Sequence, residues 1–167
     1  MPAPAAFVLF VASLASAAER SEPEQAQHVA DVAQVIWDVS AEAPQARAPW
    51  AVLLATIAGK ESAVSRRILL GHCKPWECDR GRARGLWQLH ANGLNRAAWL
   101  RSAGDLALQA KLANEQLKRS YWTCARSGVW WVAGTLSAYA GQRCGSEWTG
   151  LAPRVATWTR GARRLGL

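Results

Sequence analysis

The fold depends above all on the stretch PWAVLLATIAGKES, residues 49–62. Its apolar residues Leu54, Ile57 and Ala58 recur at spacings of three and four, which predicts one face of an α-helix. Glu61 lies seven, four and three residues beyond them and continues the same stripe. The stretch therefore predicts a largely buried helix that carries one carboxylate on its apolar side.

The segments on either side of this helix also show helical spacing. It predicts further helices over residues 24–43, 104–120, 129–139 and 151–165. No stretch alternates apolar and polar residues for long enough to suggest a half-buried sheet. The run GHCKPWECDRGRAR at 71–84 breaks all periodicity and predicts a surface loop, with room for one short β-hairpin near 71–90. We therefore expect one mainly α domain over residues 19–167.

The first 18 residues differ from the rest of the chain. Residues 5–18 are apolar or small and end in Ala15-Ser16-Ala17-Ala18, a pattern typical of a cleaved secretory signal peptide. A signal over 1–18 would make the protein exported, either periplasmic or secreted. No Lys or Arg precedes the apolar core, and an ordinary buried helix is the alternative. The run is too short for a comfortable membrane span, so no stable membrane insertion is expected.

Four cysteines, Cys73, Cys78, Cys124 and Cys144, bear on the compartment and on metals. An even number in an exported chain favours two disulfides. Three pairings are open, and we favour 73–78 with 124–144 because each pair brackets a segment containing Gly, Pro or Trp. A zinc site is the competing interpretation, but residues 124 and 144 are too widely spaced for a zinc knuckle. We therefore expect no metal, and nothing suggests a cofactor.

The chain is basic, with 20 Lys and Arg against 12 acids and a net charge of +8. A basic surface attracts anionic partners, and an exported protein meets an anionic cell envelope rather than nucleic acid. An Arg-rich chain that merely keeps itself soluble is an equal alternative. We expect a monomer.

Glu61 stands out among the acids because the others have simpler explanations. Glu77 and Asp79, for example, share the 71–84 loop with several basic residues. An apolar wall and the C-terminal end of a helix both favour the protonated carboxyl, which a general acid needs near neutral pH. The alternative is that Glu61 makes a fold contact or pairs with an Arg from the following loop.

Three short motifs follow one another along the chain. Glu61-Ser62 ends a predicted helix, Gly85-Leu86-Trp87-Gln88-Leu89 comes after the loop, and Ala138-Tyr139-Ala140-Gly141 follows about 50 residues later. This order resembles the soluble lytic transglycosylase and goose-type lysozyme superfamily, whose pattern is Glu-Ser, Gly-Leu-Met-Gln-Leu and Ala-Tyr-Asn-Ala-Gly. The resemblance covers roughly residues 50–160. It departs from the pattern in two places: Trp87 replaces Met, and the Asn after Tyr139 is absent.

The resemblance implies a lysozyme-like α fold with a glycan groove between two helical lobes. It implies that Glu61 is the catalytic acid and that Ser62 and Gln88 shape the site and bind sugar. Tyr139 would lie near Glu61 and hold its carboxyl or an N-acetyl group. Trp87 suits stacking on a sugar face, as does the nearby Trp76. The partner would be a peptidoglycan glycan strand.

The mechanism turns on whether a second carboxylate exists, since most glycosidases use two. Asp79 and Asp105 are candidates, but nothing in the sequence brings either beside Glu61. A single acid fits lytic transglycosylation, in which Glu61 cleaves the bond between N-acetylmuramic acid and N-acetylglucosamine and leaves a 1,6-anhydromuramyl end. The alternatives are a muramidase that hydrolyses the same bond, a catalytically inactive wall-binding protein, and a cationic protein that damages membranes.

Overall fold

The structure is a computed structural model that describes residues 1–16, 23–74, 76–91, 94 and 96–167. Its helices are α1 (Ala5–Leu14), α2 (Pro23–Val39), α3 (Arg47–Ser62), α4 (Arg66–Leu69), α5 (Arg96–Arg101), α6 (Leu106–Cys124), α7 (Trp131–Tyr139) and α8 (Leu151–Arg164). In the described residues, the 3-10 turn η2 (Ser40–Glu42) lies between α2 and α3, and the 3-10 turn η3 (Asp79–Gly81) lies between α4 and β1. Strands β1 (Ala83–Arg84) and β2 (Leu89–His90) pair antiparallel. The prediction of a mainly α fold is confirmed, and the short hairpin lies inside the predicted range.

The predicted helix bounds shift by a few residues. The helix expected to end at 120 continues to Cys124, and it begins after Asp105, whose carboxylate accepts the backbone N–H of Leu108 at 2.9 Å. The helix expected over 24–43 ends at Val39 and continues as the 3-10 turn η2. Helices α4 and α5 were not predicted, because four and six residues are too few to show a helical period.

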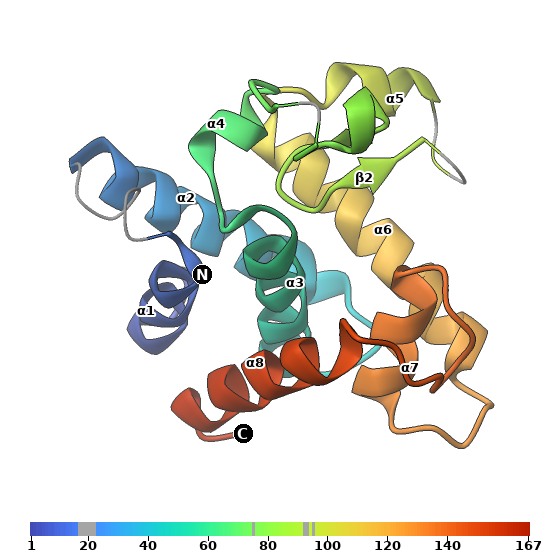
Figure 1. The fold of residues 1–167 in the computed structure, drawn as a ribbon. Coiled ribbons are helices and arrows are strands. Elements are labelled where there is room, and N and C mark those ends of the chain that lie inside the picture. Colours follow the sequence, from blue (N-terminus) through green and yellow to red (C-terminus); the bar gives the residue numbers. More distant parts are fainter. Residues whose placement is uncertain (17–22, 75, 92–93, 95) are drawn as a thin grey trace.

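Helix α3 forms the centre of the core. Every residue from Trp50 to Ala58 is buried, so the helix is enclosed on all sides and the single apolar stripe was too narrow a description. Helices α1, α2, α6 and α8 pack against it (Figure 1). The Trp50 indole donates to Asn114 Oδ1 on α6 at 2.8 Å, which pairs both polar groups inside the core. This enclosure sets the position of Glu61 at the end of α3.

Helix α1 also belongs to the core of the described fold. Its residues Phe7, Phe10 and Val11 are buried, and the helix contacts α2, α3 and α8. Two glycines let it approach closely: a Cβ at Gly59 would lie 2.8 Å from Leu14 Cβ, and one at Gly161 would lie 2.6 Å from the Phe10 ring. Residues 5–14 thus have the packing of the buried helix that was the alternative to a signal peptide.

The signal peptide over 1–18 itself stays a prediction. Its expected cleavage point, after Ala18, falls at residues 17–22, outside the described part of the chain. In the part that is described, no helix has both the length and the apolar character needed to cross a membrane.

Both predicted disulfides are confirmed. Cys73–Cys78 closes the loop between α4 and β1, and Cys124–Cys144 joins the end of α6 to the segment after α7. Because all four sulfurs are bonded in pairs, they are not available as the thiolate ligands of a zinc site. Within the described ranges, no group of three or more His, Cys, Asp or Glu side chains is arranged to hold a metal.

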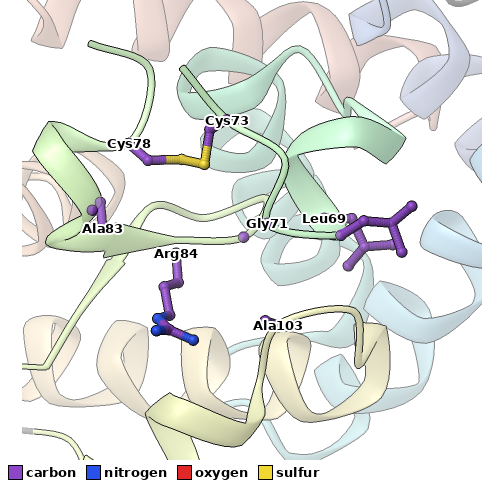
Figure 2. Close-up of a pocket in the computed structure, with 10 residues that line it drawn as sticks. Leu69, Gly71, Cys73, Cys78, Ala83, Arg84 and Ala103 are labelled. Carbon is purple, nitrogen blue, oxygen red and sulfur yellow. A yellow bond between two sulfur atoms is a disulfide. The ribbon is translucent and has the colours of Figure 1, made fainter. Parts of the chain in front are cut away.

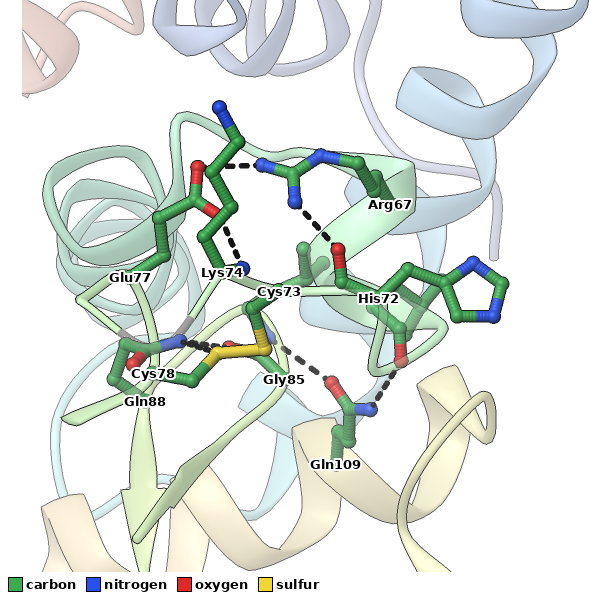
Figure 3. Close-up of a disulfide and its surroundings, with 11 residues drawn as sticks. Arg67, His72, Cys73, Lys74, Glu77, Cys78, Gly85, Gln88 and Gln109 are labelled. Atoms are coloured by element: carbon green, nitrogen blue, oxygen red, sulfur yellow. Dashed lines mark hydrogen bonds and ion pairs between the residues drawn. A yellow bond between two sulfur atoms is a disulfide. The ribbon is translucent and has the colours of Figure 1, made fainter. Parts of the chain in front are cut away.

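The turn between β1 and β2 is anchored on α6 through one buried amide (Figure 3). Gln109 donates to the carbonyls of Leu69 at 3.1 Å and Ser102 at 2.7 Å, and its Oε1 accepts the backbone N–H of Leu86 at 3.0 Å. Gly85 has a left-handed backbone (φ +68°), and a Cβ there would lie 1.9 Å from Gln109 Oε1. The second motif is therefore held against α6 by a fully buried side chain that the sequence analysis did not single out.

Candidate functional site

Glu61 lies in the last turn of α3, which stops abruptly one residue later. Ala63 and Val64 both take left-handed backbone conformations, at φ 52° and φ 57°. A β-branched residue rarely adopts this conformation, and such strain persists only where the surroundings impose it. Val64 is fully buried, and its carbonyl oxygen lies 3.0 Å from His28 Nε2. The forced stop leaves the carboxylate of Glu61 at the end of the central helix, facing an open pocket.

Four segments far apart in the chain line this pocket, which has a volume of about 440 Å³. They are the end of α3, the turn between β1 and β2 with the end of β2, and the end of α7 with the two residues after it, together with the loop that leads into α8 and α8 itself; Gln116 of α6 completes the lining. Of the predicted site residues, Glu61, Trp87, Gln88 and Tyr139 are among the lining residues, whereas Ser62 is not. The three motifs therefore converge in space as well as following one another in sequence.

Two further depressions adjoin this pocket. One, of about 350 Å³, shares Gln116 and Gly141 with it, and the other, of about 650 Å³, shares Trp148. We call the three together the trench. Glu61 lines the pocket that shares residues with each of the other two, which we call the middle pocket. Each pocket falls within the size range of small-ligand sites.

Glu61 forms an ion pair with Arg154 from α8. Arg154 Nη2 lies 2.5 Å from Glu61 Oε1, and the two side chains are 18% and 26% exposed. The alternative interpretation had expected a pair with an arginine of the loop after α3. The partner is an arginine, but it comes from α8. The carboxylate expected against an apolar wall therefore has a cation as its neighbour.

Tyr139 joins α7 to the second motif. Its hydroxyl donates to the backbone carbonyl of Trp87 at 3.0 Å. Burial, and then the negative charge of Glu61, raise the pKa of Tyr139 far above its usual range, while Arg154 acts in the opposite direction. The phenol therefore stays protonated. The resemblance had implied that Tyr139 holds the carboxyl of Glu61 or an N-acetyl group. In this structure its hydroxyl hydrogen is donated to the Trp87 carbonyl instead.

Trp87 and Ser62, which were predicted to contact sugar, are both buried. The ring of Trp87 is fully buried and its indole N–H donates to the Leu54 carbonyl at 3.0 Å, so it has no exposed face on which a sugar can stack. The expected stacking role is not available to it. The Ser62 hydroxyl donates to the Ala58 carbonyl at 2.9 Å and is buried. Both side chains are buried and donate their hydrogen bonds to backbone carbonyls of α3.

Gln88 is the polar residue of the second motif that reaches the pocket. Its backbone is left-handed (φ 48°), and its Nε2 donates to the Gly85 carbonyl at 3.1 Å. The side chain is partly exposed, so its amide oxygen is able to accept a hydrogen bond from a bound molecule.

Trp148 is the aromatic side chain that sequence reasoning missed. It lines two of the three pockets, and the guanidinium of Arg154 lies 5.0 Å from its ring centroid. Trp148 belongs to none of the three motifs. The high tryptophan content of the chain was the only feature of the sequence that hinted at further aromatic side chains in the site. Trp76, the other tryptophan considered for stacking, is 76% exposed but does not line the trench.

The carboxylates proposed as second acids have other roles. Asp79 pairs with Arg82 at 2.8 Å, and Asp105 caps α6. Among the residues that the structure describes, Glu61 is the one carboxylate that lines the middle pocket. Glu147, which lies in none of the three motifs, lines the adjoining pocket of about 650 Å³.

A separate cavity of about 230 Å³ lies between the disulfide-closed loop, β1 and the connection from α5 to α6 (Figure 2). Its cation Arg84 is engaged, since it donates to the Leu100 carbonyl at 3.0 Å and lies 4.4 Å from the Trp99 ring centroid. In the same loop, the hydrogen bond from Arg67 lowers the pKa of Glu77, helped by the backbone N–H of Lys74 (Figure 3). These charges form the surface cluster that the sequence predicted.

The middle pocket therefore combines a carboxyl group, a guanidinium, an amide, a protonated phenol and an indole face. This set is suited to transferring a proton to a polar substrate while the amide and indole hold it. In comparisons with protein-family models, curated proteins and solved structures, nothing matched this chain.

Proposed function

We propose that this protein is a lytic transglycosylase of lysozyme-like fold, which cleaves the β-1,4 bond between N-acetylmuramic acid and N-acetylglucosamine in peptidoglycan. The observation that carries the proposal is the meeting of Glu61, Gln88 and Tyr139 in one pocket of an open trench. Each belongs to a different motif of the sequence pattern that suggested the family. Three matches in order along the chain, joined in space around one carboxyl, are specific in combination.

In the proposed reaction, Glu61 gives its proton to the oxygen that links the two sugars, and the bond from that oxygen to C1 of the muramic acid breaks. The carboxylate then takes the proton from the 6-hydroxyl of the same sugar, whose oxygen bonds to C1. The product is a 1,6-anhydromuramyl end, and Glu61 regains its proton. The attacking hydroxyl belongs to the bound sugar, so no second carboxylate is needed to activate water.

The carboxylates around the site favour this reaction over hydrolysis. Retaining and inverting glycosidases place two carboxyl groups on either side of the bond to be cleaved. Glu61 has no such companion among the described residues lining its pocket. Hydrolysis is the second candidate, because Glu147 lines the adjoining pocket and is the group that would activate water there.

The compartment is part of the proposal. Disulfides persist in oxidising surroundings, and both pairs of cysteines are bonded. We infer that the protein is exported, to the periplasm or beyond the cell, and acts as a monomer on the glycan strand without a cofactor.

The test is mass spectrometry of purified sacculi digested with the natural protein and with Glu61→Gln. We expect 1,6-anhydromuropeptides from the natural protein and a loss of about 100- to 10,000-fold in the variant, the usual contribution of a general acid. Glu42→Gln is the matched control, because Glu42 is an exposed carboxylate on η2, outside the trench. Products with reducing ends alone would establish hydrolysis. No release of sugar by any form of the protein would leave a wall-binding protein.

A further inference from the structure

The ion pair between Arg154 and Glu61 poses a problem for the proposed acid. The guanidinium occupies a carboxyl oxygen of Glu61, because Arg154 Nη2 donates to Glu61 Oε1 at 2.5 Å. The pair is partly exposed, so both groups remain partly hydrated and the net stabilisation from pairing is small. A competing charged ligand can therefore break it. Some event during substrate binding must therefore separate Arg154 from Glu61.

Two contacts other than Glu61 fix the position of the Arg154 guanidinium. Its Nη1 donates to the Gly150 carbonyl at 3.0 Å, and its guanidinium lies against the Trp148 ring. A Cβ at Gly150 would lie 1.8 Å from that ring and 2.6 Å from Arg154 Nη1, so the position accepts only glycine while both side chains keep their places. The guanidinium thus keeps two contacts that do not involve Glu61. It stays in the wall of the trench if the carboxylate leaves.

We propose that Arg154 senses a carboxylate on the glycan, and that this carboxylate replaces Glu61 as the partner of the guanidinium. The inference rests on the proposed function. Muramic acid carries a lactyl group that ends in a carboxylate or continues into a peptide stem with its own carboxylates. Exchange of one carboxylate for another leaves the guanidinium paired, and its planar fork suits either partner. Glu61, released from the guanidinium, is then free to meet the oxygen between the two sugars.

The pairing makes Arg154 a specificity-determining residue. A neutral amino-sugar strand has nothing to offer the guanidinium, so Glu61 remains tied and cleavage is slow. An acidic strand pairs with Arg154 and frees Glu61 in the same step. The protein would therefore select acidic glycan through its catalytic group rather than through a remote binding surface.

The experiment compares four glycan strands: strands with peptide stems and strands stripped of them by an amidase, each used as such and after its carboxylates are converted to neutral amides. The proteins are the natural chain, Arg154→Met, Arg154→Lys and Glu61→Gln. Arg163→Met is the matched control, since it removes a cation from the exposed side of the same helix, outside the trench. Circular dichroism melts establish that each variant is folded.

We expect the natural chain to cleave acidic strands at least about tenfold faster, in kcat/KM, than amidated ones, as a charge-assisted hydrogen bond provides. Arg154→Met should bring this ratio close to one, with a raised KM on acidic strands and a raised kcat on amidated ones. In strands with stems the lactyl carboxyl forms the amide bond to the stem, so a preference on these strands identifies the stem carboxylates as the sensed group. A preference on the stripped strands identifies the free lactyl carboxylate. Arg154→Lys should fall between the natural chain and Arg154→Met.

Two results would overturn the inference while leaving the proposed function intact. One is a folded Arg154→Met with the strand preference of the natural chain. The other is a folded Arg154→Met as inactive as Glu61→Gln on every strand, since the guanidinium would then be needed for cleavage itself. If the natural chain cleaves no strand, the proposed function and the inference fail together.

Discussion

Gly85→Ala should destabilise the protein far more than Gly81→Ala, although the two glycines are alike in backbone conformation. Their φ values are +68° and +82°, where an alanine costs about 1–2 kcal/mol. A Cβ at Gly81 meets nothing within 4 Å. A Cβ at Gly85 would lie 1.9 Å from Oε1 and 2.2 Å from Cδ of Gln109. The comparison therefore separates the cost of the conformation from the cost of displacing the buried amide.

The magnitude follows from the bonds of Gln109. Its side chain donates to two carbonyls and accepts one backbone N–H, all in a fully buried position. Moving the amide away leaves several of these groups without partners, at about 1–3 kcal/mol each. We expect Gly85→Ala to cost about 3 kcal/mol more than Gly81→Ala, which is a large part of the stability of a typical domain.

Urea denaturation with both disulfides intact measures this difference, since the midpoint and slope together give the free energy of unfolding. A double-mutant cycle with Gln109→Ala isolates the contact. In the Gln109→Ala background, Gly85→Ala should cost no more than Gly81→Ala does. The reasoning is refuted if the two glycine variants differ by less than about 1 kcal/mol in the natural background, because Gln109 would then not be the anchor of the turn.

In the full 167-residue chain, Phe10→Ala should lower the free energy of unfolding by about 3–5 kcal/mol, whereas Leu9→Ala on the same helix should cost under about 0.5 kcal/mol, since Phe10 is 2% exposed and Leu9 is 67% exposed. Thermal melts compare them, and equal small shifts would mean that α1 does not pack in the core. Because burial raises the pKa of Tyr139, stability should be kept up to about pH 10 and decline above it, where the unfolded phenol ionises and the native one does not. Tyr139→Phe should remove this component of the decline in urea titrations from pH 8 to 11, and an unchanged decline would contradict the assigned burial.

The local pattern of the sequence was enough for the helical class, the hairpin region and both disulfides. Helical periodicity and the positions of Gly, Pro and Cys are properties of neighbouring residues, and they survive without knowledge of the packing. The same reasoning singled out Glu61, because an acid on an apolar stripe is visible in a single helix. It also expected Gln88 and Tyr139 at one site through the order of the motifs, and both line the pocket of Glu61.

Only the tertiary structure decided which side chains from different helices contact one another. Arg154 meets Glu61 from 93 residues away, and no local signal marks either as the partner of the other. The burial of Trp87 and the packing of α1 on Gly59 depend on how closely α3 is enclosed, which is a property of the assembled core. Sequence periodicity reports which face of an element is apolar, but the charge beside a carboxyl is set by the side chains that other elements bring to it.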